Sequence, residues 1–429
     1  MAKKMLFLFV LLLSLTGMLK AQVTTAGMSG KVVADEEAVI GATVVAVHEP
    51  SGTSYGTVTN IDGRFSLQGM RSGGPYKVTV SYVGYQTAIY TGIQLQLGET
   101  YSLNVTLHEA SELLGEITIT ASKSKFSAEK TGATTNISSE QLTTLPSINR
   151  SISDFTRISP YASGNNFGGR DGRSNTFTVD GANLNNNFGL SSNLPGGGNP
   201  ISLDAIDEVQ VVIAPYDVRQ ANFIGAGINA ITKSGTNAYR GSAYMYFNNE
   251  VMRGNKIGNT DFGARAEESK TVYGATLGGP IIKDKLFFFA NVEYEKSPQQ
   301  VVKWRAAQEG ETPNNSTISR ATAADMVEFS QILKDKYGYD TGSFTNFPAN
   351  ITNLKLLGRI DWNIDKGNKL SVRYNFTNNK TWNAPNGSSG NTGYRLAYDR
   401  VSQYSMSYAN SCYSLQNIVN SVTAELNSR

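Results

Sequence analysis

The side chains that most often carry enzyme chemistry are scarce in this chain. It has one cysteine, Cys412, and two histidines, His48 and His108, and neither histidine lies in a cluster of cysteines or carboxylates at zinc-ligand spacing. The sequence also has no Ser/His/Asp arrangement built on the glycine-flanked turn of a nucleophile. We therefore predict no enzyme activity, no catalytic residue, no metal site and no cofactor, and we expect both histidines on strand surfaces.

The polar residues with a distinctive order lie in one glycine-rich stretch, residues 164–237. In its first half, GGRDGR at 168–173 is followed by FTVDG at 177–181, where apolar and polar residues alternate up to an Asp-Gly turn. Such an alternation predicts a strand that closes into a hairpin.

The second half of this stretch predicts one helical turn at 203–208 and a short strand at 209–213, which a proline follows. Small residues and glycines at 225–235 then leave room for a neighbouring backbone or a wall. Two short helices are expected upstream, at 139–142 and 148–158, because each has Ser or Thr near its start.

In their order and spacing, these pieces resemble the plug domain of TonB-dependent outer-membrane receptors, and the resemblance implies a plug over residues 126–236. The alternative is a soluble α/β domain with glycine turns, since each of these motifs taken separately is compatible with such a domain. The family's motif falls on eight residues of this chain: Arg170, Asp171, Val179, Asp180, Gly181, Asn229, Thr232 and Lys233.

Residues 1–21 predict a secretory signal peptide, since a lysine pair precedes an apolar run at 5–15 and Ala21 suits cleavage. An uncleaved membrane anchor is the alternative, but it needs about 18 or more apolar residues. The formal net charge of +3 comes from three leader lysines, Lys3, Lys4 and Lys20. The remaining chain is near neutral, so we expect no nucleic-acid partner.

Residues 22–109 predict a small β-sandwich, because short alternating strands follow one another with glycine turns between them. The stretches TNIDGRFSL at 59–67 and VSYVGYQ at 80–86 resemble the carboxypeptidase regulatory-like domain. In that family the module is non-catalytic, and it is often appended to the N-terminus of Bacteroidetes receptors. We find no peptidase domain beside it.

Residues 110–125 form a predicted linker with one β-prone segment. Six of its residues resemble a TonB box: Glu116, Ile117, Thr118, Ile119, Thr120 and Ala121. An exposed strand of this kind could add to the sheet edge of a periplasmic partner, where main-chain hydrogen bonds supply the affinity. The alternative is a strand that pairs within the plug or the sandwich.

Residues 237–429 predict the N-terminal part of a transmembrane β-barrel. In 286–294 one face carries Leu286, Phe288, Ala290, Val292 and Tyr294, which could meet lipid, and 354–364 and 370–376 alternate in the same way. Links that are short at 280–285 and 365–368 alternate with long polar ones at 250–269, 306–351 and 383–397. The second long link also predicts a helix at 323–337, packed on its own loop.

Residues 237–244 and 278–289 closely resemble the Oar-like branch of the TonB-dependent receptors. The fold class is accordingly mostly β, with a sandwich, an α/β plug and the first strands of a 22-stranded antiparallel barrel. We count about seven strands after residue 237, so the chain is interpreted as an N-terminal fragment of such a receptor.

The resemblance implies energised passage of a large substrate, such as a nutrient, glycan, peptide or protein, across the outer membrane of a Gram-negative cell. The N-terminal domains would lie in the periplasm. The expected partners are the inner-membrane TonB complex, outer-membrane lipid and a surface lipoprotein. An adhesion or assembly protein that uses the barrel as an anchor is the alternative.

Overall fold

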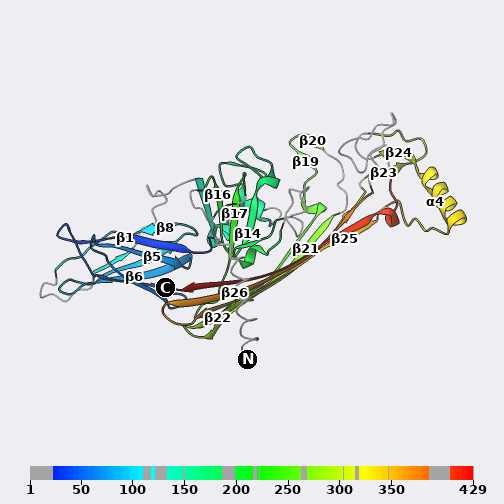
Figure 1. Ribbon diagram of the computed structural model, residues 1–429. Coiled ribbons are helices and arrows are strands. Elements are labelled where there is room, and N and C mark those ends of the chain that lie inside the picture. Colours follow the sequence, from blue (N-terminus) through cyan, green and yellow to red (C-terminus); the bar gives the residue numbers. More distant parts are fainter. Residues whose placement is uncertain are drawn as a thin grey trace, which may run out of the picture.

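The computed structural model describes residues 23–109, 117–120, 133–147, 150–185, 199–215, 220–221, 223–261, 268–302, 304–314, 318–345, 347–385 and 406–428. The predicted signal peptide, residues 1–21, lies outside the described residues, as do Glu116 and Ala121. The described chain forms an N-terminal sandwich, a central sheet domain and a long curved wall of strands (Figure 1). Across these ranges, no helix has the length and hydropathy to span a membrane.

The N-terminal sandwich consists of two five-stranded sheets. The first is ordered β2-β1-β5, with β8 and β9 also paired to β1, and the second is ordered β10-β7-β6-β3-β4. The bounds are β1 Ala26–Ala34, β2 Glu37–Ala38, β3 Thr43–His48, β4 Thr53–Val58, β5 Arg64–Met70, β6 Gly73–Ser81, β7 Ala88–Leu95, β8 Thr100–Ser102, β9 Val105–Thr106 and β10 Ile117–Thr120. Alternate side chains such as Met28, Val44 and Val78 fill one core, so the predicted sandwich is confirmed.

The expectation that both histidines lie on strand surfaces is wrong for His48. Its side chain is buried at the end of β3, where Nδ1 and Ser51 Oγ lie 2.7 Å apart. Burial, together with the charges of Arg71 and Lys369, lowers the pKa of His48 to about 3 and keeps the imidazole neutral. His108 is exposed as predicted, but it lies two residues after β9 and in no strand.

The central domain is built on the sheet β11-β16-β17-β14-β15. Its strands are β11 Ala133–Ser138, β14 Thr176–Val179, β15 Ala182–Asn183, β16 Ile206–Ile213 and β17 Gly227–Thr232, with the small pair β12 Ala162–Ser163 and β13 Asn166–Phe167. Its helical segments are α2 Ser139–Thr144, α3 Ile152–Thr156, η1 Gly172–Ser174 and η2 Leu203–Ala205. A core that includes Phe155, Phe177 and Val209 lies beneath the sheet.

Two boundaries in this domain differ from the prediction. The helical turn expected at 203–208 ends at Ala205, and the strand β16 begins three residues earlier than expected. Pairing explains the difference, because Ile206 already lies opposite Thr232 of β17. The helix expected at 148–158 is the shorter α3, and residues 148 and 149 lie outside the described ones.

The wall is a six-stranded antiparallel sheet ordered β18-β21-β22-β25-β26-β27. The bounds are β18 Arg240–Asn249, β21 Ser269–Ile282, β22 Leu286–Gln300, β25 Pro348–Asn363, β26 Asn368–Asn383 and β27 Tyr413–Ser428. The count of about seven strands is therefore one too high over the described residues. Much of the chain between β22 and β25 lies at the loop end instead, as β23 Arg305–Ala307, β24 Ile318–Thr322 and α4 Ala323–Tyr337.

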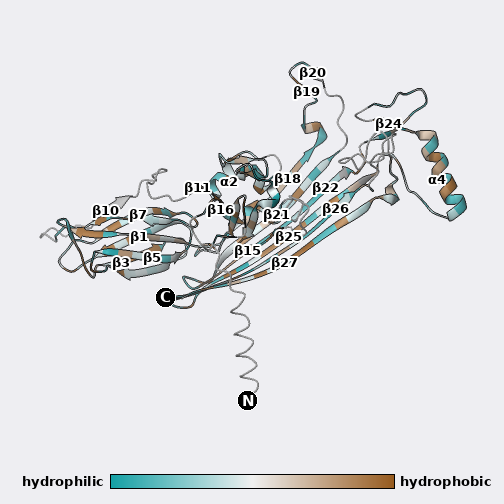
Figure 2. Ribbon diagram, turned by 45° about the horizontal axis from the view of Figure 1, so that its top comes forward, coloured by the Kyte–Doolittle hydropathy of each residue, from teal (hydrophilic) through white to brown (hydrophobic). Residues whose placement is uncertain are grey.

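The two faces of the wall differ in polarity, which the alternating colours along each strand make visible (Figure 2). Outward positions such as Ile360 and Trp362 are exposed and apolar, whereas the inward Lys355, Arg359 and Asp361 are buried against the central domain. The predicted period of two is thus confirmed. Near the start of β22, Phe289 also faces inward and joins the central core, so the inner face is apolar there.

The helix predicted at 323–337 has those bounds. Thr322 caps its start by accepting from Asp325 N–H, and Gly338 ends it in the left-handed conformation. Met326 packs with Ala306 and Tyr408, so the helix rests on its own loop and on the loop before β27, as expected. The remaining strand and helical pieces, β19 Lys256–Ile257, β20 Thr260–Asp261, η3 Glu250–Met252 and η4 Ala409–Ser411, also lie in loops.

Candidate functional site

The candidate site lies where the central domain meets the inner face of the wall, and it is centred on Asp180. Asp180 and Gly181 form the tight turn of the predicted hairpin between β14 and β15, with φ of 47° and 82°. Aspartate tolerates the left-handed conformation better than most residues, and glycine adopts it freely. The turn directs the Asp180 carboxylate toward the wall instead of solvent, and the residue is buried.

The Asp180 carboxylate is held on its own side by Thr232 of β17. Thr232 N–H donates to Oδ1 at 3.0 Å, and the Thr232 hydroxyl donates to Oδ2 at 2.6 Å. The parallel pairing of β14 with β17, in which Val179 lies opposite Ala230, brings these two motif residues together. Both oxygens of the Asp180 carboxylate are therefore held by the central domain itself, independently of the wall.

Two wall arginines face this carboxylate. Arg359 Nη1 on β25 lies 3.8 Å from Asp180 Oδ1, and Arg373 Nε on β26 lies 3.6 Å from the same oxygen. Arg359 Nη1 also donates to Thr232 O at 2.5 Å. Both arginines are less than 9% exposed, so the positive charges of the wall are neutralised in part by a carboxylate of the central domain.

Two wall carboxylates pair with the same arginines. Arg359 Nε donates to Asp361 Oδ2 at 2.8 Å and its Nη2 donates to Asp361 Oδ1 at 3.0 Å, while Arg373 Nη1 donates to Glu425 Oε2 at 2.8 Å. We call this group the Asp180 cluster: Asp180, Arg359, Asp361, Arg373 and Glu425. Removing Arg359 or Arg373 would take the hydrogen-bonded guanidinium from a buried wall carboxylate, and breaking a buried pair typically costs about 3–5 kcal/mol.

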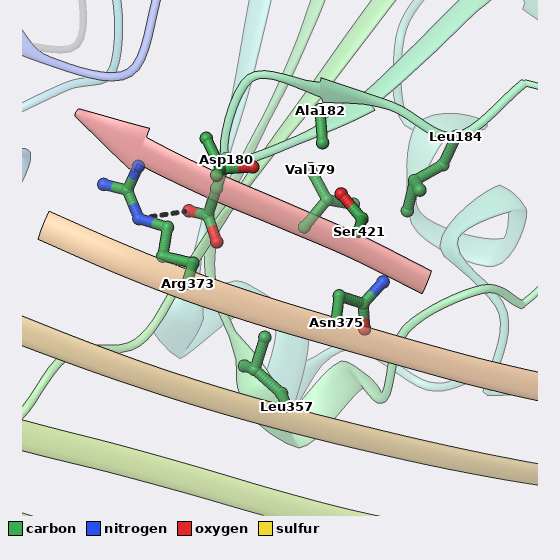
Figure 3. A pocket seen from close by; sticks show the side chains of 9 residues that line it. Val179, Asp180, Ala182, Leu184, Leu357, Arg373, Asn375 and Ser421 are labelled. Atoms are coloured by element: carbon green, nitrogen blue, oxygen red, sulfur yellow. Dashed lines mark ion pairs between the residues drawn. The ribbon is translucent and has the colours of Figure 1, made fainter. Parts of the chain in front are cut away.

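A small cavity lies beside the cluster, between the hairpin and strands β25 to β27 (Figure 3). Its volume of about 10 Å³ is close to that of one water probe. Arg373 Nε and Asn375 Nδ2 are both buried and make no hydrogen bond within the described part of the chain. The packing at the Asp180 cluster is thus polar and incomplete on the β27 side.

A second contact joins the two domains farther along the wall. Ser202 Oγ lies 2.8 Å from Glu293 Oε2 on β22 and 2.9 Å from the Tyr244 hydroxyl on β18. Tyr244 also donates to Glu293 Oε2 at 2.9 Å, and Lys355 Nζ donates to Glu293 Oε1 at 2.8 Å. We call this group the Glu293 cluster: Ser202, Tyr244, Glu293 and Lys355. Both of its charges belong to the wall.

The other predicted motif residues do not join the Asp180 cluster. Asn229 accepts from Thr178 Oγ1 at 2.7 Å inside the central sheet, and Lys233 donates its backbone N–H to Ala205. Asp171 is exposed and pairs with Arg173 at 2.8 Å, which lowers the pKa of Asp171. Val179 lies in the central core, and Arg170 N–H bonds Phe167 O in an exposed turn.

The TonB-box-like segment is described only as the strand β10, Ile117–Thr120. It pairs in parallel with β7 of the sandwich, with Ile117 opposite Ala88 and Thr120 opposite Thr91. This pairing within the sandwich was the alternative left open by the sequence. Because β10 is the terminal strand of its sheet, its other edge has no strand beside it among the described residues.

The sequence did not single out the wall residues of either cluster as site residues. In the sequence, the alternating strands show only polar positions at Arg359, Asp361 and Arg373. Charged residues on the inward face of a barrel could have indicated a contact with a domain inside it. In the described ranges, no group of three metal-binding side chains comes together. What the arrangement offers chemically is a charged attachment of one domain to another.

Comparisons with known proteins agree with these features. Residues 27–108 match the carboxypeptidase regulatory-like domain, and residues 231–428 match an outer membrane beta barrel domain. The TonB-dependent transporter Oar of Myxococcus xanthus is 24% identical over 347 residues, which cover 76% of this chain and 30% of the relative. The chain thus spans about a third of the length of that relative.

Among solved structures, the outer membrane transporter YddB from Escherichia coli is 13% identical, with a TM-score of 0.45 over 69% of this chain and 37% of that chain. The siderophore receptor PirA from Pseudomonas aeruginosa is 15% identical, with a TM-score of 0.37 over 59% of this chain and 36% of that one. From the sequence matches, this chain is a homologue of the TonB-dependent transporter Oar, located in the outer membrane, with a carboxypeptidase regulatory-like domain and an outer membrane β-barrel domain.

Proposed function

We propose that this chain carries the gating parts of a TonB-dependent outer-membrane transporter for a large substrate, such as a nutrient, glycan, peptide or protein. Residues 126–236 act as the plug, and the wall at 237–429 is part of a 22-stranded barrel. The observation that carries the proposal is the Asp180 cluster, because it attaches the central domain to the wall by buried ion pairs beside the apolar contact that Phe289 and Leu357 make with the central core. A charged attachment can be broken and remade without unfolding either side.

Energy for this movement comes, in our proposal, from an inner-membrane TonB complex that binds residues 116–121 from the periplasm. Residues 22–109 then lie in the periplasm, and a surface lipoprotein and outer-membrane lipid are the other partners. The terminal position of β10 supports the proposal, because a partner's strand can add to an open sheet edge. Main-chain hydrogen bonds would supply most of the affinity.

The Ile119→Pro variant of the full-length receptor tests this function. Proline removes one backbone N–H from the strand and fixes φ, so strand addition should fail. We expect the purified periplasmic domain of the TonB protein to bind the variant at least about tenfold more weakly than the wild type, measured with the solubilised receptor on a sensor surface.

Thr118→Val is the matched control, since it keeps every backbone donor and a β-branched side chain. Both variants should show the heat-modifiable gel migration of a closed barrel, which separates a coupling defect from a folding defect. Undiminished binding by Ile119→Pro would refute coupling through residues 116–121 and would favour the alternative, a barrel that serves as an anchor for adhesion or assembly.

A further inference from the structure

The N-terminal sandwich contacts both the central domain and the wall, and two of its turns make contacts near the Asp180 cluster. One turn follows β7 and lies against β11 and β16 of the central domain. The other, Arg71 and Ser72 between β5 and β6, lies against β25 of the wall. The sandwich is therefore a third body at the junction that the Asp180 cluster holds.

The turn after β7 makes its polar contacts through the backbone of Leu97. Leu97 N–H donates to the Glu208 carboxyl, with N–O distances of 3.1 and 3.0 Å to its two oxygens. Leu97 O accepts from Asn136 Nδ2 at 3.3 Å and from Gln210 Nε2. Both backbone groups of one sandwich residue are thus bonded to side chains of the central sheet.

The side chain of Leu97 adds an apolar contact between the two domains. It is fully buried with Val23 and Ile231 and stands apart from the sandwich's own core. The next residue, Gly98, has a φ of +70°, and a Cβ there would lie 2.7 Å from Gln210 Nε2. Glycine is therefore needed both for the conformation of this turn and for its close approach to the central domain.

The second turn is held rigidly by two tyrosines of the sandwich. Arg71 N–H donates to the Tyr55 hydroxyl at 3.1 Å, and the Tyr76 hydroxyl donates to Arg71 O at 2.6 Å. This fixed backbone directs the guanidinium of Arg71 to the wall, where Nη2 lies 3.8 Å from Asp361 Oδ1. Asp361 is the same carboxylate that holds Arg359 of the Asp180 cluster.

Arg71 completes the balance of charge in that cluster. The ion pairs join three carboxylates to three guanidinium groups, and only one of the six comes from the sandwich: Asp180, Asp361 and Glu425 with Arg71, Arg359 and Arg373. Without Arg71, two arginines would face three carboxylates. A second sandwich residue, Thr24, donates to Glu425 Oε1 at 2.9 Å.

The sandwich also holds the wall independently of the cluster. Asn363 Nδ2 donates to Thr53 Oγ1 at 3.1 Å, and Lys369 Nζ lies 3.1 Å from the centre of the Tyr55 ring. Asn237, just before β18, donates its N–H to Pro50 O at 2.9 Å. The sandwich therefore bridges the wall and the central domain instead of contacting only one of them.

We propose that the N-terminal sandwich is a brace that holds the central domain against the wall, with the Leu97 turn as its attachment to the central domain and Arg71 as its attachment to the Asp180 cluster. The inference rests on the proposed function, in which the central domain moves. Before that movement the sandwich must detach, because its contacts would otherwise keep β16 at a fixed distance from β25. Arg71 and Leu97 are positioning residues in this scheme and touch no substrate.

Hydrogen exchange of the full-length receptor in membranes, followed by mass spectrometry, tests the brace without substrate or partner. In Arg71→Met, amides of β16 should exchange at least about tenfold faster, since the buried network of three carboxylates then keeps only two guanidinium groups. Amides of β3 and β6 in the sandwich core should keep their wild-type protection. Arg71→Lys, which keeps the charge, should restore much of the protection of β16.

Arg64→Met is the matched control, because Arg64 is an exposed arginine on β5 of the same sandwich. It should leave the exchange of β16 unchanged. Wild-type exchange of β16 in Arg71→Met, with β3 and β6 still protected, would overturn the proposal.

Leu97→Ala is a second test of the brace, for use if Arg71→Met unfolds the sandwich. The Leu97 side chain lies outside the sandwich core, so its truncation weakens only the contact with Val23 and Ile231. The brace predicts faster exchange in β16 with β3 and β6 intact, and unchanged exchange would reject it. Because the measurement involves no transport, failure of the brace and failure of the proposed function give different results.

Discussion

The two clusters that join the central domain to the wall differ in which side supplies the charges. In the Asp180 cluster, a carboxylate of the central domain faces two arginines of the wall. In the Glu293 cluster, Glu293 and Lys355 both belong to the wall and pair with each other at 2.8 Å, while the central domain supplies the Ser202 hydroxyl and places Arg150 over the Tyr244 ring. With Arg71 of the sandwich counted, withdrawal of Asp180 would leave three guanidinium groups facing two carboxylates, whereas Glu293 and Lys355 would stay paired.

This difference predicts which contact resists movement. A hydroxyl that leaves a paired carboxylate forfeits one hydrogen bond, worth about 1 kcal/mol. A carboxylate that leaves two buried arginines removes a negative charge from a buried network, which costs far more, although Arg359 and Arg373 keep their hydrogen bonds to Asp361 and Glu425. We infer that the Asp180 cluster holds the central domain in place and that the Glu293 cluster guides it.

The largest effect is expected for Asp180→Asn. The amide keeps an acceptor for Thr232 N–H but removes the negative charge that faces Arg359 and Arg373. The free energy of local opening of the central domain, measured by hydrogen exchange in the full-length receptor, should fall by about 3–5 kcal/mol. Asp171→Asn, at an exposed position of the same domain, should change nothing measurable, and a loss at Asp180 below about 1 kcal/mol would contradict the comparison.

The second effect concerns pH at the junction of the sandwich and the central domain. Burial raises the pKa of Glu208 from its ordinary 4.5 to about 8; the Leu97 N–H opposes the rise, and Asp207 and Glu99 nearby add to it. The docked state therefore binds a proton that the undocked, hydrated state releases. Docking is strongest below about pH 4.5 and weakens as the pH rises to about 8, by up to about tenfold per pH unit.

Spin labels at the exposed Val83 of the sandwich and Tyr161 of the central domain, with Cys412 replaced by serine, would report this docking as a distance distribution. The fraction at the short distance should decline between pH 5 and 8 in the wild type. Glu208→Gln cannot ionise and should remove the decline. The same pH profile in both proteins would exclude Glu208 as its cause.

The sequence predicted the parts of this arrangement that local pattern determines. The Asp180-Gly181 turn, the alternation in β25 and the bounds of α4 follow from neighbours within a few residues. The partners of Asp180 do not, because Arg359 and Arg373 are far away in the chain and meet it only once the central domain is docked on the wall. A motif can identify such an aspartate, but the register between two domains decides what it binds.

The burial of His48 and the place of β10 escaped prediction for the same reason. His48 ends an alternating strand, so the sequence alone places it at a surface, and the turn that holds Ser51 covers it. The segment Ile117–Thr120 has the β-branched pattern of any edge strand, and only the assembled sandwich provides β7 as its neighbour. Local propensity gave the type of element and tertiary pairing gave its partner.

The smallest effect is expected for Ser202→Ala. This variant tests the comparison directly, because it weakens the contact at the Glu293 cluster without removing a charge. Glu293 would still accept from Tyr244 and Lys355, so the variant loses one hydrogen bond and leaves no charge unpaired. The opening free energy of the central domain should fall by about 1 kcal/mol, several times less than in Asp180→Asn. Ser242→Ala, on the exposed surface of β18, serves as the control and should have no effect. If the opening free energy fell as much in Ser202→Ala as in Asp180→Asn, both clusters would hold the central domain. The strength of each contact would then not depend on which domain supplies the charged residues.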